Sequence, residues 1–385
     1  MTASVVRVIT AVAATLLMPS AALAATPVSA ALAAPAASAA VAAPAASAAE
    51  PLPALALPAP TGPYQIGVVT RHLVDADRAD PWVPDRPREL MVSLWYPALP
   101  GTGPAAPYVT PAESAAILAQ FQITSVPPEI LSTTTTHSRT NARQLPKPGS
   151  RSLVILSPGF TLPRSSLTGL AEELASHGYL VAGIDHTYEA AAITFPDGRI
   201  TGCLACRTAD GEAVSASRAR DVSFVLDTLR GSYNPHAVAM VGHSIGGSAT
   251  ASTMLADHRI DVGVNMDGTF FPPVPESGLQ RPFLMLGAEQ HGTPGNDHTW
   301  TGTWPNLTGW RRWLTVTGTD HLSFTDYAPL GDQIGVPIQP LPGARCLQIT
   351  RTYVNAVLDR HLRSRISPLL AGSSPRYPEV IFQNP

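Results

Sequence analysis

One serine of this chain stands in a pattern that is typical of nucleophilic catalysis. Ser244 is the centre of Gly242-His243-Ser244-Ile245-Gly246, which matches the motif G-x-S-x-G. The apolar run Ala237 to Val241 precedes the motif, and a predicted helix, Ile245 to Ala256, follows it. A sharp turn between strand and helix would expose the Ser244 hydroxyl at the positive end of the helix. We therefore predict a nucleophile rather than a buried serine in a glycine-rich turn.

A serine hydroxyl becomes a good nucleophile only when a positioned imidazole removes its proton. In hydrolases with this motif, the base follows the last strand and comes after the acid in the chain. His321 lies just past the predicted strand Trp313 to Thr319, so we predict that it is the base. His243 adjoins Ser244, but adjacent side chains diverge at a tight turn, and we interpret it as a packing or hydrogen-bonding residue. His186 follows a central strand and is a candidate for the pocket lining.

The acid that orients the imidazole has several candidates. Asp267 ends the predicted strand Ile260 to Met266, whereas Glu289 and Asp297 follow the next predicted strand. The active site of such a sheet lies at the carboxyl ends of its strands, so the pattern alone divides almost evenly between these places. Asp320 is disfavoured because it is adjacent to the predicted base.

Backbone N–H groups are the expected partners of the negative charge that acyl transfer places on the carbonyl oxygen of a substrate. One donor is expected from Ile245, directly after the nucleophile, and the other from the loop after the strand Ser152 to Ser157. In that loop, which reads Ser157-Pro158-Gly159-Phe160-Thr161, we select the N–H of Phe160.

Strands and helices alternate along the part of the chain that must position these residues. The predicted strands are Tyr64 to Leu73, Glu89 to Tyr96, Ser152 to Ser157, Tyr179 to Ile184, Ala237 to Val241, Ile260 to Met266, Pro282 to Gly287 and Trp313 to Thr319. The predicted helices are Ala112 to Phe121, Ser165 to His177, Val214 to Arg230, Ile245 to Ala256 and Arg345 to Leu362, and Thr133 to Ser150 is expected to be an exposed loop. This order predicts an α/β fold with a mostly parallel sheet covered on both faces.

The first 24 residues have the layout of a secretory signal peptide. Arg7 is followed by the apolar run Val8 to Met18 and by Ala22-Leu23-Ala24, and that run is shorter than the ~20 residues that span a bilayer. We expect export with cleavage near Ala24. Residues 25–62 are almost entirely Ala, Pro, Ser, Val and Leu and predict a semi-extended linker. Residues 63–385 suit one large catalytic domain.

Charge and cysteine content narrow the choice of partners. The net charge is -3 and no block of Lys or Arg stands out, so we expect no nucleic-acid partner. Cys203 and Cys206 form a C-x-x-C pair without the setting of a thioredoxin-like redox site. Export favours a structural disulfide, either within this pair or from one of its members to Cys346.

The chain resembles the α/β-hydrolase type of platelet-activating factor acetylhydrolase and related secreted bacterial lipases. The segments that carry the resemblance are Ser93-Leu94-Trp95-Tyr96-Pro97, Pro158-Gly159-Phe160, Leu174-Ala175-Ser176-His177-Gly178-Tyr179, Gly242-His243-Ser244-Ile245-Gly246-Gly247, Asn265-Met266-Asp267-Gly268 and Asp320-His321-Leu322-Ser323-Phe324. The resemblance implies the α/β-hydrolase fold and selects Asp267 as the acid. The family's oxyanion loop often has His-Gly where this chain has Pro158-Gly159, which keeps the backbone donor but weakens any transfer of substrate preference.

The expected function is hydrolysis of carboxylic esters, short-chain or phospholipid-type, through an acyl-enzyme and without a cofactor. A polyester or cutin hydrolase and a catalytically silent surface-binding module are the alternatives. The apolar residues Phe270 to Pro273 are candidates for an acyl pocket or for a transient contact with a lipid surface. Glu289, His291, Asp297 and His298 share one loop, but their spacing is not typical of a metal site.

Overall fold

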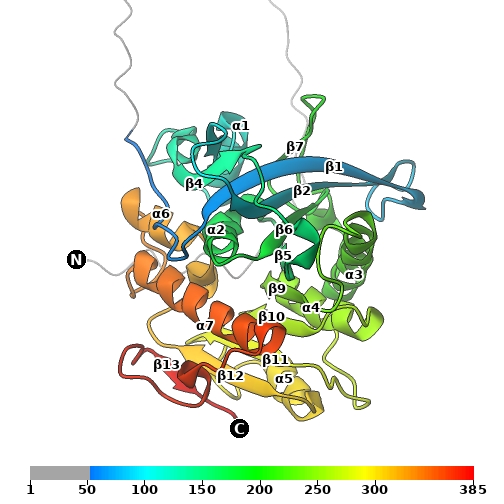
Figure 1. The fold of residues 1–385 in the computed structure, drawn as a ribbon, viewed down its shortest axis with the longest axis vertical. Coiled ribbons are helices and arrows are strands. Elements are labelled where there is room, and N and C mark those ends of the chain that lie inside the picture. The colour runs from blue at the N-terminus through cyan, green and yellow to red at the C-terminus, as the bar shows by residue number, and fades with distance from the viewer. Residues whose placement is uncertain (1–52) are drawn as a thin grey trace, which may run out of the picture. The chain divides into compact units, whose positions relative to one another are not determined.

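The computed structural model describes residues 53–385, which form a single large sheet flanked by helices (Figure 1). The sheet has 11 strands. From edge to edge they are β13 (Val380–Phe382), β12 (Arg311–Val316), β11 (Phe283–Ala288), β10 (Val262–Met266), β9 (Val238–His243), β5 (Leu153–Ser157), β6 (Leu180–His186), β2 (Pro87–Ala98), β1 (Gln65–Ala79), β4 (Thr135–Thr140) and β3 (Ala105–Pro107). The six strands from β12 to β6 run parallel, whereas β13 pairs antiparallel with β12, and β2 pairs antiparallel with both β6 and β1. The predicted α/β-hydrolase fold is confirmed.

The central strands are apolar along their whole length because both of their faces are covered. On β5, Val154 and Leu156 face one core together with α2 (Thr168–Ser176) and α7 (Gly343–Arg363). Leu153 and Ile155, which alternate with them, face a second core with α3 (Gly211–Thr228) and α4 (Ile245–Ala256). Figure 1 shows α7 and α3 on opposite sides of these strands. Packing of the helices on the two cores fixes the positions of the central strands relative to one another. It therefore fixes the strand ends at which the candidate site lies.

Several short elements were not predicted. The expected loop over residues 133–150 contains β4, which pairs parallel with β1 from Ile66 opposite Ser138. This prediction was wrong because the polar run includes β-branched threonines that extend the sheet, while the Glu172 carboxylate accepts the N–H groups of His137 and Ser138. The predicted helix Ala112 to Phe121 corresponds to α1 (Pro111–Gln120). The other helices and small strands are α5 (His298–Thr303), α6 (Tyr327–Gln333), β7 (Ile193–Thr194) and β8 (Ile200–Thr201). The 3-10 turns are η1 (Ile130–Thr133), η2 (Pro148–Ser150), η3 (Arg164–Leu167), η4 (Ala205–Arg207), η5 (Trp304–Asn306), η6 (His321–Phe324) and η7 (Pro368–Leu370).

Residues 53–62 differ from the expected linker, because in the structure they pack on the domain. Leu55 and Leu57 are buried, and their backbones exchange hydrogen bonds of 2.7 and 3.1 Å with Thr135. The N–H of Thr61 donates to the carboxylate of Glu173 over 2.9 Å. The apolar side chains of this segment thus extend the domain on its N-terminal side. The predicted signal peptide and residues 25–52 lie outside the described residues.

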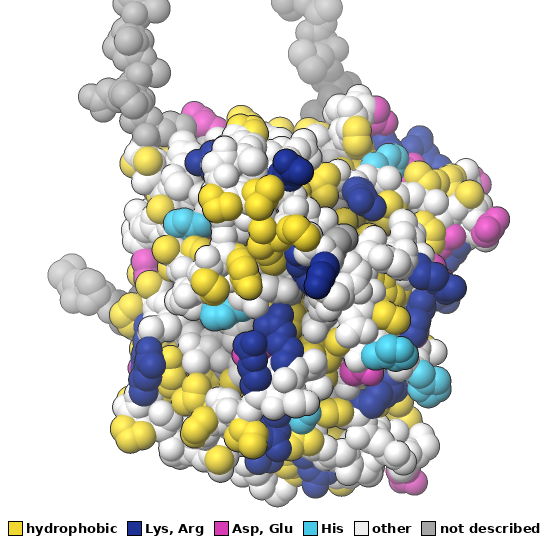
Figure 2. All heavy atoms as spheres, in the orientation of Figure 1, with side chains coloured by type: hydrophobic (Ala, Val, Ile, Leu, Met, Phe, Trp, Pro, Cys, Tyr) yellow, Lys and Arg dark blue, Asp and Glu magenta, His cyan; other side chains and the backbone are white. Residues whose placement is uncertain are grey.

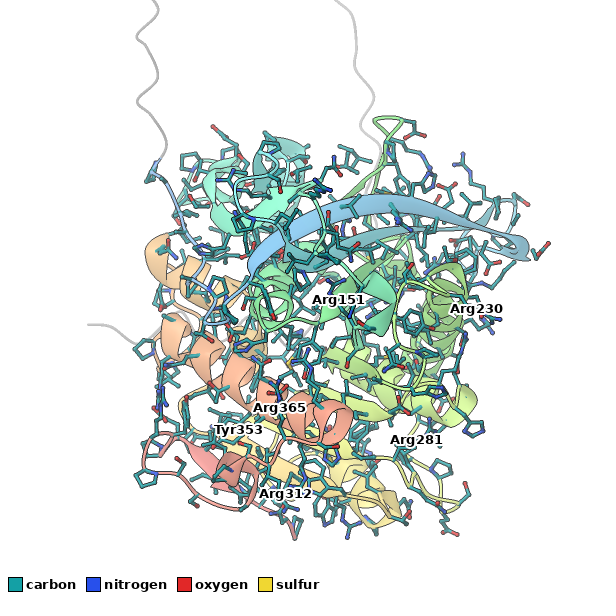
Figure 3. All side chains as sticks on the ribbon, viewed as in Figure 1. Arg151, Arg230, Arg281, Arg312, Tyr353 and Arg365 are labelled. Carbon is teal, nitrogen blue, oxygen red and sulfur yellow. A yellow bond between two sulfur atoms is a disulfide. The ribbon has the colours of Figure 1, made fainter. Side chains whose placement is uncertain are left out.

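Side chains at the other end of the strands mark the face opposite to the site. Arg151 precedes β5, Arg281 precedes β11 and Arg312 lies at the start of β12, and Figure 3 labels all three. On the face that Figure 2 shows, apolar, basic and acidic side chains are interspersed. The residues singled out in the sequence lie instead at the carboxyl ends of β5, β9, β10 and β12.

Candidate active site

Ser244 lies in a strained turn between β9 and α4. Its backbone has φ 56° and ψ −126°, and its N–H donates to the carbonyl of Met266 over 2.8 Å. A Cβ atom on Gly242 would lie 1.9 Å from the carbonyl oxygen of Gly246, and one on Gly246 would lie 2.1 Å from that of Ser157. The turn therefore requires glycine at both flanking positions of the motif, as the sequence pattern indicated.

The predicted base and one predicted acid lie in line with this serine. The Ser244 hydroxyl is 2.9 Å from Nε2 of His321, and Nδ1 of His321 donates to the Asp267 carboxylate over 2.6 Å. Since Nδ1 carries the proton, Nε2 is free to accept the hydroxyl proton of Ser244. Asp267 is fully buried at the end of β10, whereas the His321 side chain is 47% exposed. Residues from three strand ends thus form one hydrogen-bonded chain.

The other acid candidates contact different groups. Glu289 accepts the N–H of Gly318 over 2.7 Å, and Asp320 caps the 3-10 turn η6 through the N–H of His321. Asp297 is the N-cap of α5 and does not reach His321. The acid position that the family resemblance selected, Asp267, is the carboxylate in contact with the imidazole.

His243 fixes the backbone of the base rather than its ring. Its Nε2 donates to the carbonyl oxygen of His321 over 2.7 Å, as expected for a hydrogen-bonding residue. Its Nδ1 has no partner among the described residues and lies close to Gly159, so the ring is a neutral tautomer. Burial lowers the pKa of His243 to about 3.

His186 is the last residue of β6 and does not line the pocket, contrary to the expectation from its place after the predicted strand Tyr179 to Ile184. It is fully buried, with Nδ1 2.8 Å from Asp221 and Nε2 3.0 Å from the Ser157 hydroxyl. His186 belongs to a set of ionisable residues that we call the buried ion cluster. Its members are Asp80, Arg88, His186, Glu189, Arg218 and Asp221. The strand turns this side chain inward toward α3, where these charges replace its contact with water.

The buried ion cluster holds the loop that carries the predicted oxyanion donor. Arg218 donates to the carbonyl of Pro158 and to the hydroxyl of Ser157, and its Nε donates to Glu189 over 2.8 Å. The backbone of Thr161 exchanges hydrogen bonds of 2.8 Å with residues 189 and 191. Loop 157–161 is thereby fixed on both sides of Phe160.

The two predicted oxyanion donors face one pocket. Phe160 and Ile245 line the same cavity as Ser244 and His321. Within the described part of the chain, neither backbone N–H donates a hydrogen bond. Both groups are therefore available to an oxygen atom of a bound ligand, which is the property that an oxyanion site needs.

His291 is a site residue that the sequence reasoning missed. It lies between two carboxylates, with Nδ1 2.9 Å from Asp267 and Nε2 2.7 Å from Asp297. Burial opposes its protonation, but hydrogen bonds to both carboxylates raise the pKa of His291 to about 9. Burial would raise the pKa of Asp267, yet the hydrogen bonds from His291 and His321 hold it below its ordinary value. The contact could not be predicted from the sequence, because Asp267 lies 24 residues before His291.

The pocket beside Ser244 has a volume of about 480 Å³. Apolar and polar residues both line it. The apolar ones are Phe160, Ala209, Gly211, Val214, Ile245, Phe271 and Ala288, and the polar ones include Asp210, Thr269, Gln290, His291 and Asp320. A disulfide joins Cys203 to Cys206, which is one of the two predicted pairings, and Cys346 is a buried free thiol. Residues 209–211, which line the pocket, follow this disulfide closely in the chain.

Comparisons with known proteins show what this chain is similar to. The family model described as platelet-activating factor acetylhydrolase, isoform II, matches residues 52–198 and 208–337. The solved structure of a ferulic acid esterase from Streptomyces cinnamoneus is 42% identical, with a TM-score of 0.79, and covers 86% of this chain and 100% of its own.

Two curated relatives match shorter parts. A probable 1-alkyl-2-acetylglycerophosphocholine esterase of Arthroderma benhamiae is 30% identical over 60% of this chain and 65% of its own length. A cutinase of Thermobifida fusca is 30% identical over 28% of this chain and 31% of its own. The matched parts therefore span less than two thirds of these curated relatives.

Proposed function

Because this chain belongs to the platelet-activating factor acetylhydrolase, isoform II, family, we propose that it is a serine hydrolase that cleaves carboxylic esters. The observation that carries the proposal is the hydrogen-bonded chain from Ser244 through His321 to Asp267, at the carboxyl ends of the strands. Binding to a surface alone does not require a serine with strained backbone dihedrals beside an unprotonated imidazole nitrogen. The geometry therefore favours catalysis over a silent binding role.

In the proposed reaction, Ser244 Oγ attacks the ester carbonyl carbon while Nε2 of His321 takes the hydroxyl proton. The imidazolium that forms is stabilised by Asp267, which stays ionised. The tetrahedral intermediate then expels the alcohol, which receives the proton from His321, and an acyl-Ser244 ester remains. A water molecule, deprotonated by the same imidazole, hydrolyses this ester and releases the acid.

The N–H groups of Ile245 and Phe160 are the proposed donors to the oxyanion. Both line the pocket beside the Ser244 hydroxyl, and both lack another acceptor in the part of the chain that the structure covers. Fixed donors stabilise developing charge without reorganising at the moment of reaction. The departure at Pro158-Gly159 leaves this arrangement intact because only backbone groups take part.

A compact acyl group is the proposed substrate feature. A pocket of about 480 Å³ suits a small ligand, and apolar residues line it together with the nucleophile. Short-chain and phospholipid-type acyl esters fit this description. Phe271, which lines the pocket, is 38% exposed and is the proposed contact with the apolar part of a lipid surface during substrate capture.

A hydroxycinnamoyl ester is a second candidate substrate. The relative named a ferulic acid esterase matches along its whole length, and two aromatic rings, Phe160 and Phe271, line the pocket here. Aromatic rings contact a flat aromatic acyl group favourably through stacked or edge-to-face packing.

A matched substrate series tests these proposals. Hydrolysis of p-nitrophenyl esters from acetyl to palmitoyl, and of methyl ferulate, is measured for the wild type and for Ser244→Ala. We expect the wild type to prefer short acyl or feruloyl esters and the variant to be inactive. Equal rates for both proteins would contradict catalysis by Ser244. Release of soluble product from a polyester film would favour the cutinase-like alternative.

Export is proposed from the leader. No helix among residues 53–385 is long and apolar enough to cross a membrane. We expect the protein secreted into the culture medium of an expressing host to begin near Ala25, as N-terminal sequencing would show. Cell-bound protein that retains Met1 would contradict this proposal.

A further inference from the structure

His291 is held between two carboxylates, and its role is not explained by the reaction described above. Nδ1 lies 2.9 Å from Oδ1 of Asp267, and Nε2 lies 2.7 Å from Oδ2 of Asp297. The Thr269 hydroxyl is 3.1 Å from Nε2 and donates to Asp297 over 2.7 Å. Both ring nitrogens are therefore within hydrogen-bond distance of an acceptor oxygen that carries negative charge.

This geometry requires a protonated ring. A neutral imidazole donates from one nitrogen only and would turn the lone pair of the other toward a carboxylate oxygen. An imidazolium donates from both nitrogens and satisfies both carboxylates. The pKa of about 9 that these carboxylates give His291 agrees with a cation at neutral pH.

The oxygen that His291 contacts is the one that His321 leaves free. Oδ1 of Asp267 accepts from His291 and from the N–H of Ala288 over 2.7 Å, while Oδ2 accepts from His321 over 2.6 Å. Three donors thus fix the plane of a fully buried carboxylate. Without His291, Oδ1 would keep only one of its two partners, and the carboxylate would be less firmly ionised and oriented.

We propose that His291, as an imidazolium at neutral pH, is a positioning residue that holds the Asp267 carboxylate ionised and aimed at His321, with Asp297 as its counter-ion. The inference rests on the proposed function, because it assigns a second imidazole to the same reaction. His291 acts only through Asp267 and does not touch the reacting atoms.

The counter-ion is essential to this arrangement. An uncompensated cation beside Asp267 would oppose formation of the His321 imidazolium, whose ring centre is 6.4 Å from that of His291. The negative charge of Asp297 cancels the charge of His291, so the charge of Asp267 remains available to His321. The groups that face the His291 ring are Asp267, Asp297, Thr269, Trp300 and His321.

Three substitutions test the role of His291 through the pH dependence of kcat. His291→Gln removes the cation, and Asp297→Asn removes its counter-ion but keeps an amide oxygen that can cap α5. His258→Gln is the matched control, because His258 is exposed and remote from the pocket. All are assayed with p-nitrophenyl acetate from pH 5 to 10, after a check of folding by circular dichroism.

We expect His291→Gln to lower kcat about 10- to 100-fold with little change in KM, as for loss of a hydrogen bond to a charged group. The wild type should lose activity with a midpoint near pH 9, and this decline should be absent in His291→Gln. In Asp297→Asn the decline should move at least one pH unit lower, because one carboxylate no longer favours the imidazolium. His258→Gln should match the wild type throughout.

A second measurement does not depend on activity. In ¹⁵N-histidine-labelled protein at pH 7.5, both ring nitrogens of His291 should show the chemical shifts of protonated nitrogen, with the resonances assigned by comparison with His291→Gln. A neutral ring at pH 7.5, or an unchanged kcat and pH profile in folded His291→Gln, would overturn the proposal. Absence of ester hydrolysis in the wild type would instead contradict the proposed function, while the ¹⁵N shifts would still report the charge of His291.

Discussion

Two networks of paired charges are present in the described part of this molecule, and they differ in exposure and in the type of cation. The buried ion cluster joins guanidinium groups to carboxylates, and both Arg88 and Asp221 are fully buried. The second network, which we call the histidine–aspartate row, consists of Ser244, His321, Asp267, His291 and Asp297. In the row, the side chains of His291 and His321 are 26% and 47% exposed.

Pairing of opposite charges stabilises the structure in the buried ion cluster. In the histidine–aspartate row, the same kind of pairing is proposed to serve proton transfer. A guanidinium stays charged at every relevant pH, and the carboxylates around Arg88 raise its pKa further, against the effect of burial. An imidazole changes charge near neutral pH, and the two carboxylates that His291 contacts raise its pKa to about 9, against the effect of burial. The buried ion cluster therefore fixes the oxyanion loop, whereas the row can pass a proton.

The largest expected effect comes from removing the base of the row. We predict that His321→Ala lowers kcat/KM about 10,000-fold or more, since loss of a member of such a triad removes proton transfer. The temperature of unfolding should stay close to that of the wild type because the ring is half exposed. Esterase kinetics and differential scanning calorimetry measure the two quantities. If the variant lost much of its stability but kept full activity per folded molecule, the proposed role of the histidine–aspartate row in proton transfer would be contradicted.

The converse result is expected for the buried ion cluster. Arg88→Met leaves Asp80, Glu189 and Asp221 without their central cation, and we predict that the free energy of unfolding falls by about 3–5 kcal/mol. Urea denaturation measures this change. The control is Arg230→Met, at a position labelled in Figure 3, where an ion pair to Asp227 is 80% exposed on the arginine side. The control should show no measurable change, and equal stability of both variants would contradict the structural role of the cluster.

Arg218 connects the buried ion cluster to loop 157–161 of the candidate site. It donates to the Pro158 carbonyl beside the proposed oxyanion donor Phe160. We predict that Arg218→Lys, which keeps the charge but not the planar set of donors, lowers kcat about 10- to 100-fold with KM little changed. Steady-state kinetics on a short-chain ester provide the test. A variant with wild-type kcat would show that loop 157–161 holds its shape without this contact.

The smallest expected effect concerns a histidine without a carboxylate partner. Burial lowers the pKa of His243 to about 3, in contrast to His291. Between the ordinary value of 6.5 and the folded value of about 3, the unfolded chain binds the proton and the folded chain does not. Stability should therefore fall as the pH falls below 6.5, by up to about 1.4 kcal/mol per pH unit from this residue.

Urea denaturation at a series of pH values compares the wild type with His243→Gln. The slope of stability against pH between 4 and 6 should be smaller in the variant, because glutamine does not titrate. Parallel slopes would show that His243 is protonated in the folded protein. Its contrast with His291 would then be lost.

Much of the site could be predicted because its parts are encoded by contiguous residues. The elbow around Ser244 needs two close glycines after a strand, and the base needs only to follow the last long strand, at His321. The acid was not decided by pattern, since Asp267, Glu289 and Asp297 all follow strands. The family resemblance favoured Asp267, and in the structure it is the one that contacts His321.

The local chemistry follows from contiguous residues: strand-forming apolar runs, the strained serine turn and the order of strands and helices. Which charges meet depends on the folded chain, because contacts such as that of Arg88 with Asp221 join residues 133 positions apart. The same holds for β4, whose polar sequence becomes a strand beside β1, and for His291, whose two carboxylates come from different elements. Burial and hydrogen-bond partners set the charge of a histidine, and neither can be read from its neighbours in the chain.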